Sequence, residues 1–368
     1  MTRAEEVAEK LKRVNGLLER EGLDALLLTK RGNFAWLSAG GNSHVVSAME
    51  PGIASLLVTR DGWRFLITDN IELPRLQAEE MEDLGFAPVL ENWYEGGQDL
   101  AIQKKIKGRK VGSDLPIEGT RFIEPEIAKL RWSLLPSEIE RYRALGKDCA
   151  KAMGETCRTV RPGMTEFEVG ADLAGRLQAM GIEPQVLLMA ADERIRQFRH
   201  PIPTQNKVQK CCMVVVCGER HGLILSMTRL VHFGALSEDL KRRHQAAVGV
   251  DAAAIAATKP GSTAGKLFSV IKQAYAENGF PDQWQYHHQG GAMGYAARDW
   301  KAHREDDPTP IVENQAFGWN PSVAGTKSED TIIATSAGPE ILSPIPGWPV
   351  ITVETEIGPI ERADILIV

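Results

Sequence analysis

The chain has 368 residues, 43% of them hydrophobic and 25% charged, which is the composition of a soluble globular protein longer than one typical domain. The net charge of -6 argues against nucleic acid or an anionic membrane as the main partner. The longest apolar runs are too short to span a bilayer, the charged N-terminus lacks the apolar core of a signal peptide, and five cysteines do not make a disulfide framework. We therefore expect a cytoplasmic protein.

The first third of the chain predicts an α/β domain with a mixed sheet. Residues 4–21 carry apolar side chains at helical spacing, and Leu23–Thr29 follows as a buried strand. Lys30–Asn33 is expected to form a turn. Ile53–Thr59 and Trp63–Thr68 flank an Asp-Gly pair, which predicts a β-hairpin.

A long amphipathic helix is predicted to open the second domain. Ser137 can cap its first turn and Glu138 and Glu140 suit the positive end of the helix dipole, so the helix is expected to run from Pro136 to about Val160. The linker before it places a domain boundary between residues 132 and 133.

The second domain contains an internal duplication. The segment Arg161–Thr165 recurs as Lys259–Thr263, 98 residues later, and Gly181 and Gly279 are separated by the same 98 residues. Each copy has the order helix, Pro-Gly turn, helix, glycine and strands. Two copies suit one domain made of two related halves that share a sheet, with a site between them.

Chemistry-bearing residues gather between His287 and Asp330. His287 and His288 precede two glycines, which permit a tight backbone that brings an imidazole close to a ligand. A glycine-rich turn with two surface histidines is the alternative. Two hairpins are predicted: one precedes the segment, with strands at 211–218 and 223–230, and the other includes its end, with strands at 316–323 and 331–335.

The order of these motifs resembles that of the creatinase and Xaa-Pro aminopeptidase family, which also includes prolidases and methionine aminopeptidases. The resemblance covers nearly the whole chain. It is carried by Gly22–Leu27, Asn33–Gly40, Pro136–Ile139, Arg161–Thr165 and Thr228–Arg229. It implies an α/β (α+β) protein that forms a homodimer. A creatinase-type N-terminal domain is expected at 1–132, and a pita-bread domain with an internal pseudo-twofold duplication at 133–368.

Peptidases of this family hold two metal ions with two aspartates, one histidine and two glutamates. The resemblance places these five ligands, in chain order, at Val216 (or Val215, because the turn is shorter), Ser226, His288, Asn320 and Glu329. Only two of the five residue types are retained, and two metal ions would be poorly neutralised by them. We therefore predict no cofactor and no metal ligands. Cys217 is an alternative ligand, but strand alternation turns it away if residue 216 faces the site.

Creatinase-type members hydrolyse a C–N bond without metal and use the histidine as a proton shuttle. By this resemblance we predict a metal-independent hydrolase of a small amide, ureido or guanidino substrate. His288 is the expected proton shuttle, Glu329 orients it or binds a cationic group, and His200 stabilises charge on oxygen. The expected substrate-binding residues are Asn320, Tyr295, Arg298, Asp299 and His287.

Three other functions remain open. The first is an Xaa-Pro aminopeptidase or dipeptidase with an altered or mononuclear metal site. The second is a lyase that acts through the same histidine. The third is a catalytically silent member that binds a small molecule or a protein, as histone-chaperone-like members of the fold do. The fold does not decide among them. A small-molecule substrate is expected in place of nucleic acid or membrane.

Overall fold

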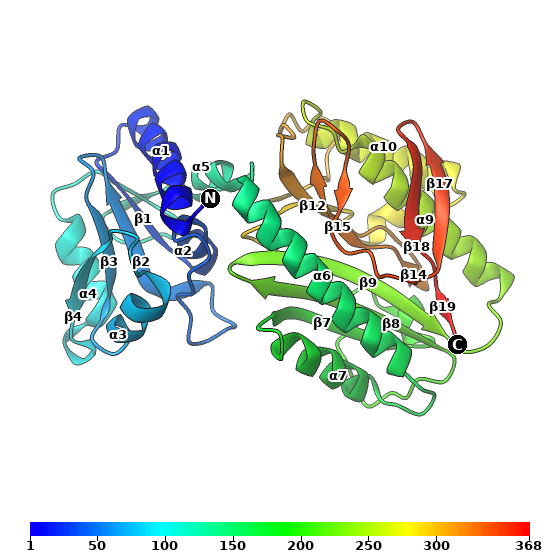
Figure 1. The fold of residues 1–368 in the computed structure, drawn as a ribbon. Helices are drawn as coiled ribbons and strands as arrows, with labels where there is room; N and C mark the ends of the chain where they lie inside the picture. The colour runs from blue at the N-terminus through cyan, green and yellow to red at the C-terminus, as the bar shows by residue number, and fades with distance from the viewer. The chain divides into compact units, whose positions relative to one another are not determined.

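A computed structural model describes all residues 1–368, and it divides into two compact units (Figure 1). Unit 1 comprises Met1–Glu138 with His221–Leu223, and unit 2 comprises Ile139–Arg220 with Ile224–Val368. Both units contain helices and strands, with one sheet in unit 1 and several in unit 2. The predicted mixture of α and β structure is therefore confirmed. The division falls inside a helix, and the predicted boundary at residue 132 stays a prediction. No helix is both long and apolar enough to cross a membrane.

Unit 1 is built on one mixed sheet of six strands in the order β4-β3-β2-β1-β5-β6, in which β1 is antiparallel to β2 and parallel to β5. The strands are β1 (Ala25–Lys30), β2 (Pro51–Thr59), β3 (Arg64–Asp69), β4 (Ala87–Glu91), β5 (Val111–Ser113) and β6 (Thr120–Phe122). The helices are α1 (Arg3–Glu21), α2 (Arg31–Leu37), α3 (Leu73–Arg75), the π-helix η1 (Leu76–Glu80), the 3-10 helix η2 (Trp93–Glu95), α4 (Gly97–Ile106) and α5 (Glu124–Arg131).

The predicted turn at Lys30–Asn33 is wrong, because α2 begins at Arg31. The cause is a set of contacts with distant residues. The amide groups of Thr29 and Lys30 donate to the buried carboxylate of Asp114, and Asn33 Nδ2 donates to the same carboxylate at 2.9 Å. Asp114 lies more than eighty positions further along the chain, so no local pattern shows it.

Unit 2 contains two larger sheets, β19-β9-β8-β7 and β11-β10-β12-β15-β16, and two small two-stranded sheets. The strands are β7 (Glu183–Ala191), β8 (Cys211–Arg220), β9 (Leu223–His232), β10 (Gly290–Met293), β11 (Trp300–Lys301), β12 (Gln315–Trp319), β13 (Ser322–Val323), β14 (Thr326–Lys327), β15 (Asp330–Ala334), β16 (Glu340–Ile341), β17 (Val350–Thr355), β18 (Gly358–Ala363) and β19 (Leu366–Ile367). The helices are α6 (Pro136–Thr159), α7 (Glu166–Gln178), α8 (Arg194–Gln197), α9 (Glu238–Ala257), α10 (Ala264–Glu277) and the 3-10 helix η3 (Gln283–Tyr286).

The backbone repeats where the sequence predicts a duplication. The Gly163 amide donates to Val208 O at 2.8 Å, and the Gly261 amide donates to Ile311 O at 2.9 Å. Both glycines have positive φ, 94° and 85°, a conformation that side chains with a Cβ rarely adopt. The residue two positions later is a threonine that caps α7 in the first copy and α10 in the second. The two copies therefore share one local fold.

The two larger sheets of unit 2 meet at one short seam. Thr228 on β9 and Glu329, just before β15, form an antiparallel bridge in which the Thr228 amide donates to Glu329 O at 3.2 Å. One step further, the Ser226 amide donates to Thr331 Oγ1 at 2.8 Å. This seam places the segment 328–331 against the middle of β9, which is the position of the site described below.

Unit 1 also contains a buried ammonium group. The fully buried Lys10 Nζ lies 2.6 Å from Glu6 Oε1 and 2.8 Å from Glu138 Oε1, and it donates to Trp36 O. Both carboxylates are about as buried as the lysine. The ammonium group of Lys10 therefore lies between two buried carboxylates, and it links α1 to the start of α6.

Lys10→Met should lower the free energy of unfolding of unit 1 by about 3–5 kcal/mol, because it removes the cation that lies between two buried carboxylates. Lys12→Met is the matched control: Lys12 pairs with Glu9 on the surface of the same helix, so its loss should cost less than about 1 kcal/mol. Urea titration followed by tryptophan fluorescence measures both. Equal losses in the two variants would contradict the role given to Lys10.

Candidate active site

Three histidine side chains from two distant parts of unit 2 lie together. His200 follows α8, and His287 and His288 lie between η3 and β10. The Nε2 atoms of His200 and His287 are 3.0 Å apart, and the ring centroids of His287 and His288 are 4.4 Å apart. One nitrogen from each ring lies within 4.8 Å of the other two. The structure thus brings together three residues that the sequence singled out separately.

Burial lowers the pKa values of all three imidazoles. Burial lowers the pKa of His287 to about 2 and that of His288 to about 4, and Lys327 and other nearby cations lower both further. Burial also lowers the pKa of the more exposed His200. The Nδ1 atoms of His287 and His288 are buried and have no hydrogen-bond partner in the protein. Each ring therefore has nitrogen lone-pair capacity that the protein does not use.

Glu329 is a buried carboxylate at the seam between the two sheets. Lys327 Nζ lies 2.7 Å from its Oε2, Thr228 Oγ1 donates to the same oxygen at 2.5 Å, and Arg298 Nη2 lies 4.0 Å from Oε1. Burial raises the pKa of Glu329, but Lys327, Thr228 and Arg298 together outweigh it, so the pKa lies below its usual value. Glu329 is therefore ionised, and its charge raises the pKa of His200, which shows that the two groups interact.

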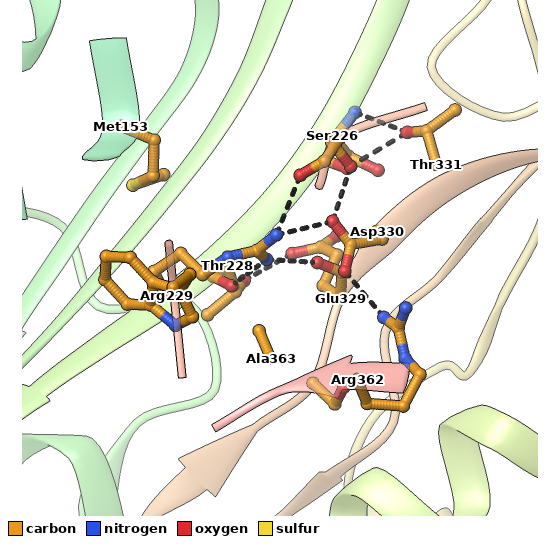
Figure 2. Close-up of polar contacts among 12 residues, drawn as sticks. Met153, Ser226, Thr228, Arg229, Glu329, Asp330, Thr331, Arg362 and Ala363 are labelled. Atoms are coloured by element: carbon orange, nitrogen blue, oxygen red, sulfur yellow. Dashed lines mark hydrogen bonds and ion pairs between the residues drawn. The ribbon is translucent and has the colours of Figure 1, made fainter. Parts of the chain in front are cut away.

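A buried network of ion pairs holds the backbone next to Glu329 (Figure 2). Asp330 lies between two arginines, with Oδ1 2.8 Å from Arg229 Nη2 and Oδ2 2.6 Å from Arg362 Nη2. Arg362 also binds Asp251 at 2.6 Å, and Ser328 Oγ donates to Asp251 at 2.6 Å. The residues on both sides of Glu329 are therefore fixed by charged groups from β9, α9 and β18.

The remaining predicted residues lie around this centre. Asn320 directly follows β12 and is buried. Its backbone amide donates to Gln289 O at 3.1 Å, and its side-chain Oδ1 has no partner. Arg298 contacts Glu329 as described, and the Asp299 amide donates to Ala292 O at 2.9 Å. Tyr295 is buried, and its hydroxyl accepts from Arg141 Nη2 at 3.4 Å.

Comparison with known proteins identifies the family. A model of metallopeptidase family M24 matches residues 140–338, more than half of the chain. The chain belongs to this family. An Xaa-Pro dipeptidase from Pyrococcus horikoshii is 22% identical over 358 residues, which cover 91% of this chain and 97% of the relative.

Solved structures of M24-like enzymes share the fold. The prolidase from Pyrococcus horikoshii OT3 superimposes with a TM-score of 0.77 at 20% identity, covering 91% of this chain and 98% of that one. Dipeptidase PepE from Mycobacterium ulcerans has a TM-score of 0.78 at 18% identity, covering 100% and 99%. The predicted membership of the creatinase and Xaa-Pro peptidase family and the predicted pita-bread fold are thereby confirmed.

The prediction that this M24 protein uses no cofactor is wrong, because the family is one of metallopeptidases and the relatives are Xaa-Pro dipeptidases. That prediction rested on the five family ligand positions, of which only His288 and Glu329 keep the residue type. Val216 and Ser226 carry no carboxylate, and both are fully buried. The prediction did not consider His200 and His287 as ligands beside His288, and the three imidazoles lie close enough together to fit a divalent metal ion.

Burial raises the pKa of the Cys217 thiol to about 12, and the charges of Glu329, Arg298 and Lys327 also influence that pKa. The direction in which Cys217 faces stays a prediction.

Arg362→Met should lower the free energy of unfolding by about 3–5 kcal/mol, because Asp251 and Asp330 would stay buried without their shared cation. Arg143→Met removes an equally short but exposed pair with Glu340, and should cost less than about 1 kcal/mol. Denaturant titrations measure both values. A loss of stability in Arg362→Met no larger than that in the control would mean that the network does not hold this part of the fold.

Without metal, in the presence of a chelator, the protein should become less stable as the pH falls from 7 to 5. The folded-state pKa values of His287 and His288 lie below the unfolded value of about 6.5, so the unfolded state binds more protons in this range and is favoured by acid. His287→Gln should reduce the slope of unfolding free energy against pH, by at most about 1.4 kcal/mol per pH unit. The exposed His303→Gln should leave the slope unchanged. An unchanged slope in His287→Gln would contradict the assignment.

Proposed function

We propose that the protein is a peptidase of the Xaa-Pro dipeptidase type, which hydrolyses the bond of a small peptide at the site formed by His200, His287, His288 and Glu329. The observation that carries the proposal is the set of three imidazoles that lie together, with the buried carboxylate of Glu329 near enough to influence the pKa of His200. The relatives that match nearly the whole chain are named Xaa-Pro dipeptidases, which supports a dipeptide substrate.

Amide hydrolysis needs a polarised carbonyl, an activated water and a proton for the leaving nitrogen. His200, His287 and His288 would hold the divalent ion of the family, which supplies carbonyl polarisation and water activation when bound. Glu329 is ionised and can accept a proton or a hydrogen bond. Its position is fixed by Lys327 and Thr228, so little reorganisation is needed when substrate binds. The proton-shuttle role of His288 stays a prediction.

A dipeptide offers an ammonium group, an amide and a free carboxylate. The Asn320 Oδ1 atom is a buried acceptor without a partner, and it suits an N–H group of the substrate. The Arg298 guanidinium has a buried, unpartnered Nε, and it suits the carboxylate. Binding roles for Tyr295, Asp299 and His287 remain predictions, as do the homodimer and the cytoplasmic location. Small amide, ureido and guanidino compounds form the competing substrate class.

Protein loaded separately with Zn²⁺, Co²⁺ or Mn²⁺ should hydrolyse Met-Pro, Ala-Pro or Gly-Pro, as measured by chromatography of the products. Glu329→Gln should lower kcat/KM by about 10²–10⁴, because it removes the ionised carboxylate from the site. The exposed Glu340→Gln serves as the control and should retain full activity.

Turnover of creatinine-like ureido or guanidino compounds but not of dipeptides would replace the proposed substrate class. No turnover of any compound with any ion would indicate a binding protein. Unchanged activity in Glu329→Gln would remove Glu329 from the mechanism.

A further inference from the structure

We propose that His200, His287 and His288 form a mononuclear metal site with nitrogen ligands, which takes one ion of the zinc, cobalt or nickel type. This differs from the pair of ions that the resemblance to carboxylate-rich peptidases implies, since two of the three ligands are residues outside that ligand set. The inference deepens the proposed function and rests on it for the catalytic role of the ion, although the binding itself can be measured independently.

The geometry suits shared coordination. Two nitrogens bound to one ion at about 2.0–2.1 Å lie about 2.9–3.3 Å apart for angles between octahedral and tetrahedral. The Nε2 atoms of His200 and His287 are 3.0 Å apart, inside this range. One nitrogen of His288 lies within 4.8 Å of a nitrogen of each of the other two rings, so binding at the same centre needs a shift of the His288 side chain. His200 is exposed and can adjust as well.

The hydrogen bonding of the cluster also points to a ligand. Buried polar atoms are nearly always paired, because an unpaired one loses its hydration without compensation. The buried Nδ1 of His288 has no partner in the protein, and a bound ion would supply one. His287 faces the shared centre through Nε2, so its own unpartnered Nδ1 is not a ligand.

The donor set selects the class of ion. Imidazole nitrogen suits zinc, cobalt and nickel, whereas manganese and magnesium prefer carboxylate and water oxygens. Three protein ligands leave a coordination position open for substrate, as in catalytic zinc sites.

The surrounding charge selects one ion over two. Glu329 is the carboxylate of the site, and Lys327 and Arg298 already compensate it. Two divalent ions would add four positive charges to a site that holds these cations. A single ion adds two, and a substrate carboxylate can offset them. The same cations weaken the binding of any metal ion in the absence of substrate.

The test is metal binding by the full-length protein without substrate. After chelation and dialysis, the protein is equilibrated with Zn²⁺, Co²⁺, Ni²⁺ or Mn²⁺, and bound metal is counted by mass spectrometry. We expect one Zn²⁺, Co²⁺ or Ni²⁺ per chain, a visible Co²⁺ spectrum of a nitrogen-ligated ion, and Mn²⁺ affinity at least about tenfold weaker.

Three variants locate the site. His200→Ala removes an exposed side chain that is a direct ligand in this proposal. It should weaken Zn²⁺ binding at least about tenfold, because the loss of a group that only hydrogen-bonds to a ligand already costs about tenfold or more. His303→Ala, also at an exposed histidine, should bind like the wild type. Glu329→Gln should keep the ion, because its carboxylate is not a ligand in this proposal. Melting temperatures in chelator check that each variant folds.

The proposal is overturned if the protein binds no ion or if it binds two ions per chain. It is also overturned if Glu329→Gln loses the ion while His200→Ala keeps it. These outcomes are separate from the dipeptide assay. A protein that binds one ion but hydrolyses no dipeptide keeps the metal site and loses the proposed function. A protein that hydrolyses dipeptides with two ions keeps the function and loses the metal site proposed here.

Discussion

The buried carboxylate of Asp330, held between Arg229 and Arg362, is the interaction on which the site depends (Figure 2). Burying charges is unfavourable unless each is paired and hydrogen-bonded, so such a network restricts the chain to one arrangement. Here it joins β9, α9, β15 and β18, which are far apart in the sequence. The backbone on either side of Glu329 has little freedom as a result, and the carboxylate is presented at a defined place on the seam between two sheets.

Electrostatics then divides the site into two parts. On one side, Glu329 remains ionised although it is buried, because Lys327 lies 2.7 Å away. On the other side, burial and the same lysine disfavour protonation of the three imidazoles. A single cation thus stabilises an anion and suppresses positive charge on its neighbours. This is a compact way to keep both an acceptor and uncharged nitrogen ligands at neutral pH.

Much of the fold could be predicted from the sequence, because its signals are local. The capped helices, the Asp-Gly hairpin and the repeated Pro-Gly turns each occupy a few consecutive residues. The helix α2 could not be predicted, because it depends on Asp114, a residue remote in the chain. Within the site, His200, His287, His288 and Glu329 were each singled out, but their convergence on a nitrogen-rich cluster was not. That convergence depends on how the segment between α8 and β8 meets the segment between η3 and β10 in space, and family ligand positions directed attention away from His200 and His287.

The repeated backbone of unit 2 has a consequence for how such a site can arise. Two identical subunits related by a twofold axis must present the same residue on both sides of that axis. A tandem copy within one chain removes that restriction, because each half can change by itself. His200 comes from the first half, and the adjacent His287 and His288 come from the second. The spacing between the two copies also changes along the chain, because the Gly163 and Gly261 amides, 98 residues apart, bind the carbonyls of Val208 and Ile311, 103 residues apart. The two halves therefore share one local fold and still contribute different residues to the cluster.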